Sequence, residues 1–369
     1  MNTLSMEERG ALRDSVHRLL QDQSTETAVR TVMETDSGYD PALWQSLAEM
    51  GVVGLIIDEA HGGSGVGPME LEAVMEEAGA ALLCSPLLAS VIAARVLQAL
   101  GDDAVSDRLL PAIASGEQIA TAVLTGDAGS WTEDGVSINA GEADGQWQLE
   151  GRGNYVMHGQ NADVLIVIAR TENGLGAFLV EAASAGVNVE ALPTFDHTQR
   201  LAAVTFSKAA AERINSSQPV WDAVGSALDL GLVALAGEQA GGAQKVLDFT
   251  VEYAKTRIQF GRQIGSFQAI KHMAADLLLE TESAISAARN AAERLASGAE
   301  KTDEAISLAA FACADAFVKT AADGIQMHGG IAFTWEHPAH LYLKRARADA
   351  QLLGSPAYHR ERYLQALGG

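Results

Sequence analysis

Two changes of periodicity, near Ile119 and near Pro219, divide the sequence into a helical, a β-rich and a second helical region. Apolar residues before Ile119 recur at helical spacing, whereas the middle region holds short runs rich in β-branched residues and separated by turn residues. Several short strands of this kind predict a β-sandwich or a β-barrel. The expected strands are Ile119–Thr125, Val136–Asn139, Trp147–Glu150, Asp163–Ala169, Ala177–Val180, Val187–Glu190 and Ala202–Phe206.

Long segments rich in alanine and leucine follow Pro219 and predict four helices, which suit an antiparallel bundle. These helices are expected at Val220–Arg257, Phe267–Ser297, Thr302–His328 and Pro338–Leu352. In the N-terminal region, Ser5 and Pro41 begin helices, and Pro86 and Pro111 are expected to interrupt them. The fold class is therefore α+β and multidomain, with a helical domain at 1–117, a β domain at 118–215 and a four-helix bundle at 219–369.

Charge and cysteine content argue against several classes of partner. The chain has 48 acidic and 25 basic side chains, a net charge of −23, which disfavours binding to nucleic acid or to an anionic membrane. Cys84 and Cys313 show neither metal-binding spacing nor a disulfide framework, so no metal site is predicted. No signal sequence and no apolar run of about 18 residues is visible, and a cytoplasmic location is expected.

The stretch Tyr253–Phe267, continued by Gln268, offers a cation, an aromatic ring and an amide around an expected helix break. Its spacing predicts Arg257 and Phe260 one turn apart on a helix, before Gly261 breaks it. Arginine presents a fork to phosphate, phenylalanine a stacking face, and the glutamine amide both a donor and an acceptor. This combination suits a ligand with phosphates and a flat ring system. The other interpretation is a solvated arginine and two core aromatic residues.

Three motifs resemble those of the acyl-CoA dehydrogenase family of flavoproteins, and the resemblance covers nearly the whole chain. They are Tyr253–Met273 (YAKTRIQFGRQIGSFQAIKHM), Gln326–Phe333 (QMHGGIAF) and the series Trp44, Gly51, Gly62-Gly63, Gly65. The resemblance implies an FAD between the β domain and the bundle, with its ADP half held partly by a neighbouring subunit. It assigns that ADP half to Arg257, Phe260, Gln268, Gln326, Gly329 and Gly330.

The flavin-ring side departs from the family pattern. An acidic-proline pair of the family is absent from Leu124–Trp131, although Gly129 and Ser130 remain. Tyr155 stands where the family has a tryptophan and can still stack, but Met157 replaces a threonine that offers flavin N5 a hydrogen bond. By the same resemblance, Gly129, Ser130, Tyr155 and Ser355 are the candidates for cofactor contact on this side.

Both family positions for the catalytic base lack a carboxylate. The family's reaction removes a proton α to the thioester carbonyl, which requires an acceptor such as glutamate. Leu353 occupies the usual base position and Gly231 the position used by a minority of members. Glu238, two helical turns after Gly231, is the remaining candidate. It is interpreted either as a displaced base or as a buried carboxylate paired with an arginine.

Four other titratable residues are weaker candidates for the missing base. His158 and His328 have side chains that can titrate near neutral pH, but His328 belongs to the pyrophosphate motif and His158 to an expected loop. Asp349 and Glu361 flank the C-terminal base position and are expected to be solvated.

The chain keeps the residues expected to contact the ADP half of FAD but has no carboxylate at either family position for the base. This combination predicts a subunit that completes the FAD site of a base-carrying paralogue. The resemblance is thus to the smaller, base-lacking subunit of actinobacterial-type heteromeric acyl-CoA dehydrogenases, which handle bulky thioesters such as sterol side chains. It implies an α2β2 heterotetramer, an acyl-CoA thioester substrate and an electron-transfer flavoprotein as electron acceptor. Two alternatives remain: a self-sufficient homotetramer using Glu238, and a flavin-free structural or CoA-binding module.

Overall fold

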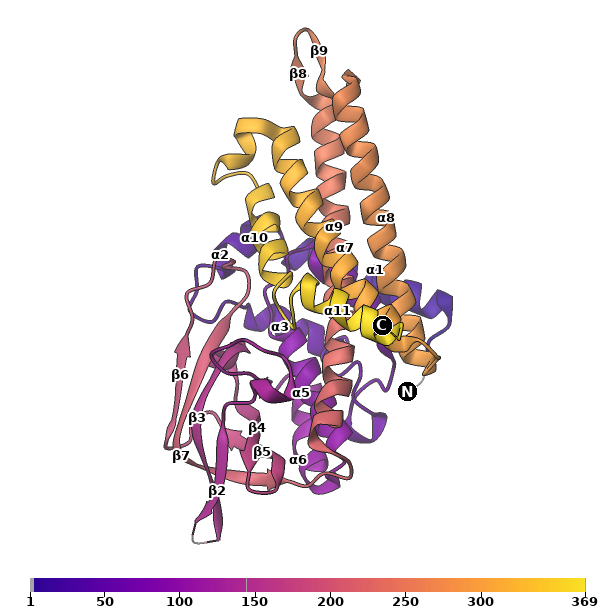
Figure 1. The fold of residues 1–369 in the computed structure, drawn as a ribbon. Coiled ribbons are helices and arrows are strands. Elements are labelled where there is room, and N and C mark those ends of the chain that lie inside the picture. The colour runs from indigo at the N-terminus through magenta and orange to yellow at the C-terminus, as the bar shows by residue number, and fades with distance from the viewer. Residues whose placement is uncertain (1–2, 144, 369) are drawn as a thin grey trace. The chain divides into compact units, whose positions relative to one another are not determined.

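The computed structural model describes residues 3–143 and 145–368 (Figure 1). Helices up to Ala114, strands between Ala120 and Ile214 and helices from Val220 onward confirm the predicted order of the fold. The chain forms two compact units, one of residues 31–67 and 84–231 and the other of residues 3–30, 68–83 and 232–369. The predicted domain boundaries at 117/118 and 215/219 stay predictions, and residues 1–2, 144 and 369 lie outside the described ranges.

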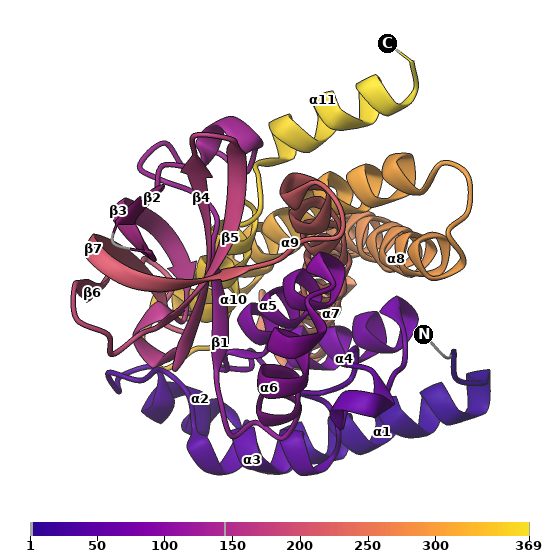
Figure 2. The same ribbon diagram turned by 90° about the horizontal axis from the view of Figure 1, so that it is seen from below.

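The first unit contains a closed β-barrel, so the barrel form of the predicted β domain is the one observed (Figure 2). Strand β4 pairs with β2, β2 with β3, β3 with β7, β7 with β5, and β5 again with β4. Strand β1 joins β4 in parallel, and β6 joins β7 antiparallel. The strands are β1 Ala120–Val123, β2 Asn139–Ala143, β3 Gln146–Met157, β4 Val164–Thr171, β5 Gly174–Glu181, β6 Val187–Ala191 and β7 Leu201–Ile214.

Alternate side chains of these strands fill the barrel, because successive residues of a strand point to opposite faces. Leu165, Val167, Phe178 and Val204 belong to this buried core. Two predicted strand starts are wrong by three residues: β2 begins at Asn139 and not at residue 136, and β5 begins at Gly174 and not at Ala177. The residues before β2 are held instead by a side chain of β4, since the backbone oxygen of Val136 accepts from Arg170 Nε at 2.9 Å.

Helices of the first unit include α3 Pro41–Glu49, the short turn η1 Glu59–His61, α5 Leu87–Leu100 and α6 Asp103–Ala114. Two of them, α3 and α6, begin at positions capped by an aspartate side chain, whereas α5 and η1 have no side-chain cap. The Asp40 carboxylate accepts from Ala42 N at 2.8 Å and caps α3. Pro111, predicted to interrupt a helix, lies inside α6. It is tolerated because it falls in the last turn, where only one backbone donor is lost before the helix ends.

The second unit is helical. Its elements are α1 Met6–Gln23, α4 Pro68–Ala80, α8 Gln268–Ser297, α9 Thr302–His328, η5 Gly329–Phe333, α10 Ala339–Asp349 and α11 Pro356–Ala366, with most of α2 Glu26–Val32 and α7 Val220–Thr256. Ser5 forms the expected cap of α1 and exchanges hydrogen bonds with Glu8 in a capping box. The sequence did not predict α2 or α11.

Close contact between α4 and α7 depends on glycine. A Cβ atom at Gly79 would lie 1.9 Å from the backbone oxygen of Glu238, and one at Gly241 would lie 1.8 Å from that of Glu76. The two helix backbones therefore touch, and the small residues of α7 serve helix packing at these positions.

Two helical segments are long and apolar enough to cross a membrane by length and composition alone. They are α7 and the segment Thr302–Phe333, and their most apolar windows are mostly buried inside the protein. Core helices of soluble proteins pass the same test. The sequence predicts no apolar run of this length. That prediction holds only for runs without charged residues, because each of the two windows contains up to two charged side chains.

Candidate functional site

The stretch expected to bind a nucleotide forms a β-hairpin between α7 and α8, which corrects the predicted placement of Arg257 and Phe260 on a helix. Helix α7 ends one residue before Arg257, and β8 Ile258–Gln259 pairs with β9 Arg262–Gln263. Phe260 and Gly261 form the turn, with φ angles of +52° and +77°. Positive φ at both central residues is the geometry of a type I′ hairpin turn. Phe260 consequently stands at the tip, where 92% of it is exposed.

Aromatic and backbone contacts hold this hairpin in place. The guanidinium of Arg262 lies 4.0 Å from the centre of the Phe267 ring, and Phe260 meets the same ring edge-on at 6.2 Å. A Cβ at Gly265 would lie 2.8 Å from the backbone oxygen of Ala254, so the hairpin base packs directly on α7. The Arg257 guanidinium, in contrast, has no hydrogen bond or ion pair within residues 3–143 and 145–368 and is open to a ligand.

The C-terminal end of α9 supplies the second part of the predicted ADP set. Gln326 is exposed in the last turn, and Gly329 ends the helix with a φ of +67° while its N–H donates to Ile325 O. A Cβ at Gly329 or Gly330 would meet no atom within 4 Å, so the backbone is open on the side where a side chain would project. Such a backbone can approach a pyrophosphate closely.

Both parts of this set lie at the same end of the helical unit (Figure 1). The Tyr253 ring stacks on the His328 ring with centroids 4.4 Å apart, which joins the end of α7 to the end of α9. Leu247, Leu277 and Met327 form a shared core cluster beneath them. Gln268, the first residue of α8, is exposed beside the hairpin. The structure thus brings Arg257, Phe260, Gln268, Gln326, Gly329 and Gly330 together; we call their surface the ADP-side end.

Three candidates of the flavin-ring side, Gly129, Ser130 and Tyr155, lie on the first unit, and the fourth, Ser355, lies on the second. Tyr155 is partly exposed at a bulge of β3, with a φ of +57°, and a Cβ at Gly129 would lie 3.1 Å from its ring. The hydroxyl of Thr125 donates to Ser130 O at 2.7 Å. The Ser130 hydroxyl is itself 2.8 Å from that of Thr132. The loop is therefore ordered by its own hydrogen bonds around Tyr155.

The positions expected for a catalytic base are closed or occupied. Leu353 is only 2% exposed and adopts a φ of +59°, and Gly231 is buried in α7. Glu238 is also buried and forms an ion pair with the buried Arg345 of α10. This pair is the one that the second interpretation of Glu238 expects. Ser355 caps α11 by accepting from Tyr358 N at 3.3 Å.

Three of the four other titratable candidates, His328, His158 and Asp349, are buried in the fold. His328 Nδ1 donates to Gly324 O at 2.7 Å, and burial is the main cause that lowers the pKa of His328 below its ordinary value. His158 is buried next to Asn161. Asp349 was expected to be solvated, and this prediction is wrong, because the folding of α10 against the bundle leaves it 1% exposed. Glu361 is exposed, as expected.

Within the described residues, no group of three or more histidine, cysteine, aspartate or glutamate side chains is placed to hold a metal ion. Cys84 and Cys313 are buried thiols. Burial is the main cause that raises the pKa of the Cys313 thiol, so it stays protonated at neutral pH.

His359 is buried behind the Leu353 loop, next to a small cavity that Gln239 and Asp349 also line. Burial lowers the pKa of His359 to about 4, against about 6.5 for an exposed imidazole. The folded protein therefore binds a proton at His359 only at a lower pH than the unfolded chain does. The contribution of His359 to the free energy of unfolding is complete above pH ~6.5. It decreases by on the order of 3 kcal/mol as the pH falls to about 4.

We expect His359→Gln to reduce this acid sensitivity, because glutamine does not titrate. Urea unfolding at pH 7 and at pH 4.5 measures it: the loss of unfolding free energy between the two should be smaller in the variant. Equal losses in variant and wild-type protein would show that His359 is accessible to protons in the folded state.

Two family descriptions match the chain: the acyl-CoA dehydrogenase N-terminal domain over residues 6–117 and the acyl-CoA dehydrogenase C-terminal domain over residues 221–368. Acyl-CoA dehydrogenase IpdE2 of Mycobacterium tuberculosis is 38% identical over 352 residues, which cover 95% of this chain and 94% of that protein. The chain belongs to the acyl-CoA dehydrogenase family. Members of this family are FAD-dependent oxidoreductases that act on the CH–CH bond of acyl-CoA thioesters.

Two solved acyl-CoA dehydrogenase structures share the fold over nearly all of the chain. The ChsE4–ChsE5 complex of Mycobacterium tuberculosis has a TM-score of 0.90 at 27% identity and covers 100% of this chain and 99% of its own. A variant of the Tcur3481–Tcur3483 steroid acyl-CoA dehydrogenase has a TM-score of 0.88 at 28% identity, with 98% of each chain covered.

The ADP-side end fits the adenosine diphosphate part of FAD. Arg257 offers an unpaired guanidinium for a phosphate, the Gly329–Gly330 backbone is open to close approach, and Phe260 exposes a ring for stacking. On the ring side the fit is partial. Tyr155 can stack, but Met157 is buried and its thioether donates no hydrogen bond.

Proposed function

We propose that this chain is the non-catalytic subunit of an FAD-dependent acyl-CoA dehydrogenase built from two unlike chains. In this account it forms an α2β2 heterotetramer with a paralogue that carries the catalytic carboxylate. Its ADP-side end completes the FAD site of that paralogue. The observation that carries the proposal is the buried Leu353 at the base position of a chain whose nucleotide-gripping residues remain exposed.

The reaction needs a free carboxylate that this chain does not present at the family positions. Bound FAD accepts a hydride from the β carbon, and a base must take the α proton at the same time. Leu353 has no proton acceptor, and Gly231 has no side chain. The Glu238 carboxylate is held by the Arg345 guanidinium inside the bundle. Removal of the α proton is therefore assigned to the partner.

The ADP-side end also has the surface of a subunit contact. Large apolar side chains are exposed on the hairpin and on the connection between α9 and α10: Ile258, Phe260, Ile331, Phe333 and Trp335. Concentrated exposure of this kind is typical of surfaces that another protein covers. In the proposed assembly the partner and its FAD cover these side chains, while Arg257 and the Gly329–Gly330 backbone receive the phosphates.

The relatives support both the two-chain assembly and the substrate class. Two of the similar structures are named as pairs of unlike chains, and one of them is named as a steroid enzyme. We infer a bulky acyl-CoA thioester, such as one with a sterol side chain, as the substrate. An electron-transfer flavoprotein is the proposed electron acceptor, and the cytoplasm the proposed location.

Expression of the chain alone and together with its base-carrying paralogue tests this proposal. We expect a 1:1 complex by native mass, with acyl-CoA dehydrogenation in the complex and none by the lone chain. Within the complex, the volume-conserving change Leu353→Met should leave turnover unchanged, whereas removal of the partner's base should abolish it. Turnover by the lone chain would contradict the proposal.

A further inference from the structure

Helix α4 buries four glutamate side chains, which is unusual because a buried charge is costly unless it is paired. Glu70, Glu72, Glu76 and Glu77 are each less than 10% exposed. Helix α4 is buried on nearly all sides, with Glu70 and Glu77 on one side of the helix and Glu72 and Glu76 on the other. Each carboxylate therefore needs a cation or a proton.

Helix α1 supplies basic side chains at helical spacing. Arg9 Nε lies 3.1 Å from Glu70 Oε1, Arg13 contacts both Glu76 at 2.8 Å and Glu77 at 2.6 Å, and His17 Nδ1 lies 2.6 Å from Glu77 Oε2. Residues 9, 13 and 17 are four apart and share one face of the helix. We call this set of contacts the α1–α4 zipper.

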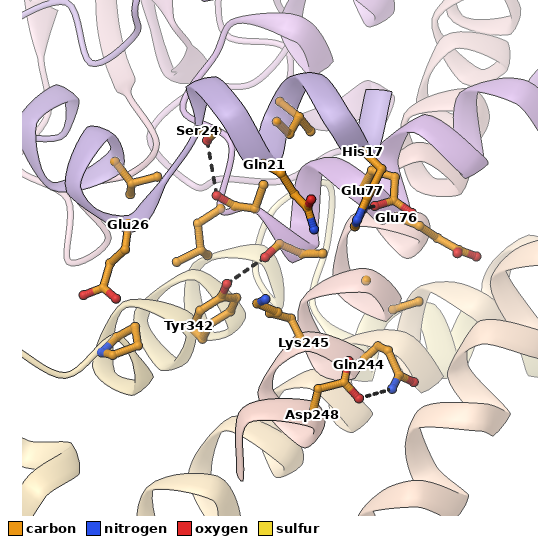
Figure 3. Close-up of a pocket in the computed structure, with 18 of the residues that line it drawn as sticks. His17, Gln21, Ser24, Glu26, Glu76, Glu77, Gln244, Lys245, Asp248 and Tyr342 are labelled. Carbon is orange, nitrogen blue, oxygen red and sulfur yellow. Dashed lines mark hydrogen bonds and ion pairs between the residues drawn. The ribbon is translucent and has the colours of Figure 1, made fainter. Parts of the chain in front are cut away.

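The zipper borders a pocket of about 750 Å³, and Figure 3 shows His17, Glu76 and Glu77 side by side along its wall. From α8, Arg289 binds the Glu76 carboxylate through two nitrogens at 2.8 and 2.9 Å. Glu76 therefore joins α1, α4 and α8 through one carboxylate that accepts from two arginines.

Glu72 is the fourth carboxyl group and has no arginine of its own. Its side chain is hydrogen-bonded to Glu76, and its Oε1 atom is buried without a hydrogen-bond partner among the described residues. The α7 backbone lies close to Glu72 here, because a Cβ at Gly237 would lie 2.7 Å from the Glu72 backbone oxygen. A hydrogen bond between two carboxyl groups requires that one of them hold a proton.

The surrounding charges place that proton on Glu72. Burial is the main cause that raises the pKa of Glu72 well above its ordinary value, and the charge of Glu76 adds to it. The guanidinium groups of Arg13 and Arg289 act in the opposite direction but bind Glu76 directly. Other titratable groups near the cluster are the protonated Cys313 thiol of α9, Glu282 of α8, and Lys245 of α7, which lines the same pocket as Glu76.

We propose that Glu72 holds a proton in the folded protein and that this proton locks α1 onto α4. With the proton, Glu72 donates to Glu76, and the three arginines neutralise the three remaining carboxylates. Without the proton, the side chains of Glu72 and Glu76 are both negatively charged. Their repulsion then weakens the ion pair between Glu76 and Arg13. Helix α1 then detaches more readily as the pH rises.

The direction of the pH effect follows from the raised pKa of Glu72. The stabilisation is fully present below the pKa of a glutamate in the unfolded chain, about 4.3, and is lost as the pH rises toward the raised value in the folded state. It does not depend on flavin or on a partner, because every group involved belongs to this chain.

Glu72→Gln tests the proposal in the full-length chain, because the amide keeps the shape and the donor of a protonated glutamate. Hydrogen-exchange protection of the α1 amides should fall between pH 5 and pH 9 in the wild-type protein and stay level in Glu72→Gln. The melting temperature of the variant should equal that of the wild type near pH 4.5 and exceed it increasingly at higher pH. The same pH dependence in both proteins would overturn the proposal.

Glu70→Gln is the matched control, because it removes a buried carboxylate of the same helix that already has Arg9 as its partner. It should lower the melting temperature at every pH without flattening the pH dependence. Infrared spectroscopy of the wild-type chain gives a second readout that needs no variant. A protonated carboxyl band should persist at neutral pH, and its absence would also overturn the proposal.

Discussion

Replacing Arg257 by alanine is expected to weaken FAD binding to the assembled enzyme by about 10- to 150-fold. A charge-assisted hydrogen bond to phosphate contributes about 1.5–3 kcal/mol, and a tenfold change in affinity corresponds to about 1.4 kcal/mol. The side chain has no partner in the described parts of the chain, so its loss should not disturb the fold. Flavin retained after dialysis, measured by absorbance, gives the result.

Arg262→Ala is the matched control for this experiment. Arg262 is an arginine of the same hairpin, but its guanidinium stacks on the Phe267 ring and is not assigned to the cofactor. Its removal should leave the FAD affinity within a few-fold of the wild type. Unchanged flavin content in Arg257→Ala would favour a flavin-free structural or CoA-binding module.

Glu238→Gln is expected to destabilise the chain by about 3–5 kcal/mol, because it removes one partner of the buried ion pair with Arg345. The change keeps the size and shape of the side chain, so a lost ion pair and not a cavity causes the effect. Urea unfolding at neutral pH measures the difference. This size of effect distinguishes a structural carboxylate from a catalytic one.

A double replacement separates the charge from the packing. Glu238→Leu combined with Arg345→Met removes both charges and should recover most of the stability lost in Glu238→Gln. Turnover of the complex should survive wherever the protein stays folded. Complete loss of turnover in Glu238→Gln at an unchanged unfolding free energy would instead support a displaced base and a self-sufficient enzyme.

Local patterns predicted the elements well and their endings less well. The sequence predicts the helix Thr302–His328 at its observed bounds, because its helical periodicity and the glycine that ends it are both local signals. The hairpin after α7 was missed because Phe-Gly is not the usual Asn-Gly or Asp-Gly pair of a type I′ turn. The short strands predicted a barrel or a sandwich, but the pairing of β4 with β5 that closes the ring is non-local.

Charge patterns on single helices were harder to interpret. The net charge of −23 does not show which glutamates are buried, and Arg9 and Arg13 of α1 pair with glutamates of α4 only once the two helices are packed together. Arg345, the partner of Glu238, lies 107 residues away in the sequence, and nothing local indicates the pair. The sequence also predicts a solvated Asp349, because no local pattern shows that the packing of α10 buries it.

Flavin absorbance during addition of an acyl-CoA tests the central claim most directly. The two samples are the chain purified alone and the chain purified with its base-carrying paralogue. We predict stoichiometric FAD that bleaches on substrate addition in the pair, and neither stoichiometric FAD nor bleaching in the lone chain. Stoichiometric FAD that an acyl-CoA bleaches in the lone chain would contradict the assignment of this chain as a non-catalytic subunit.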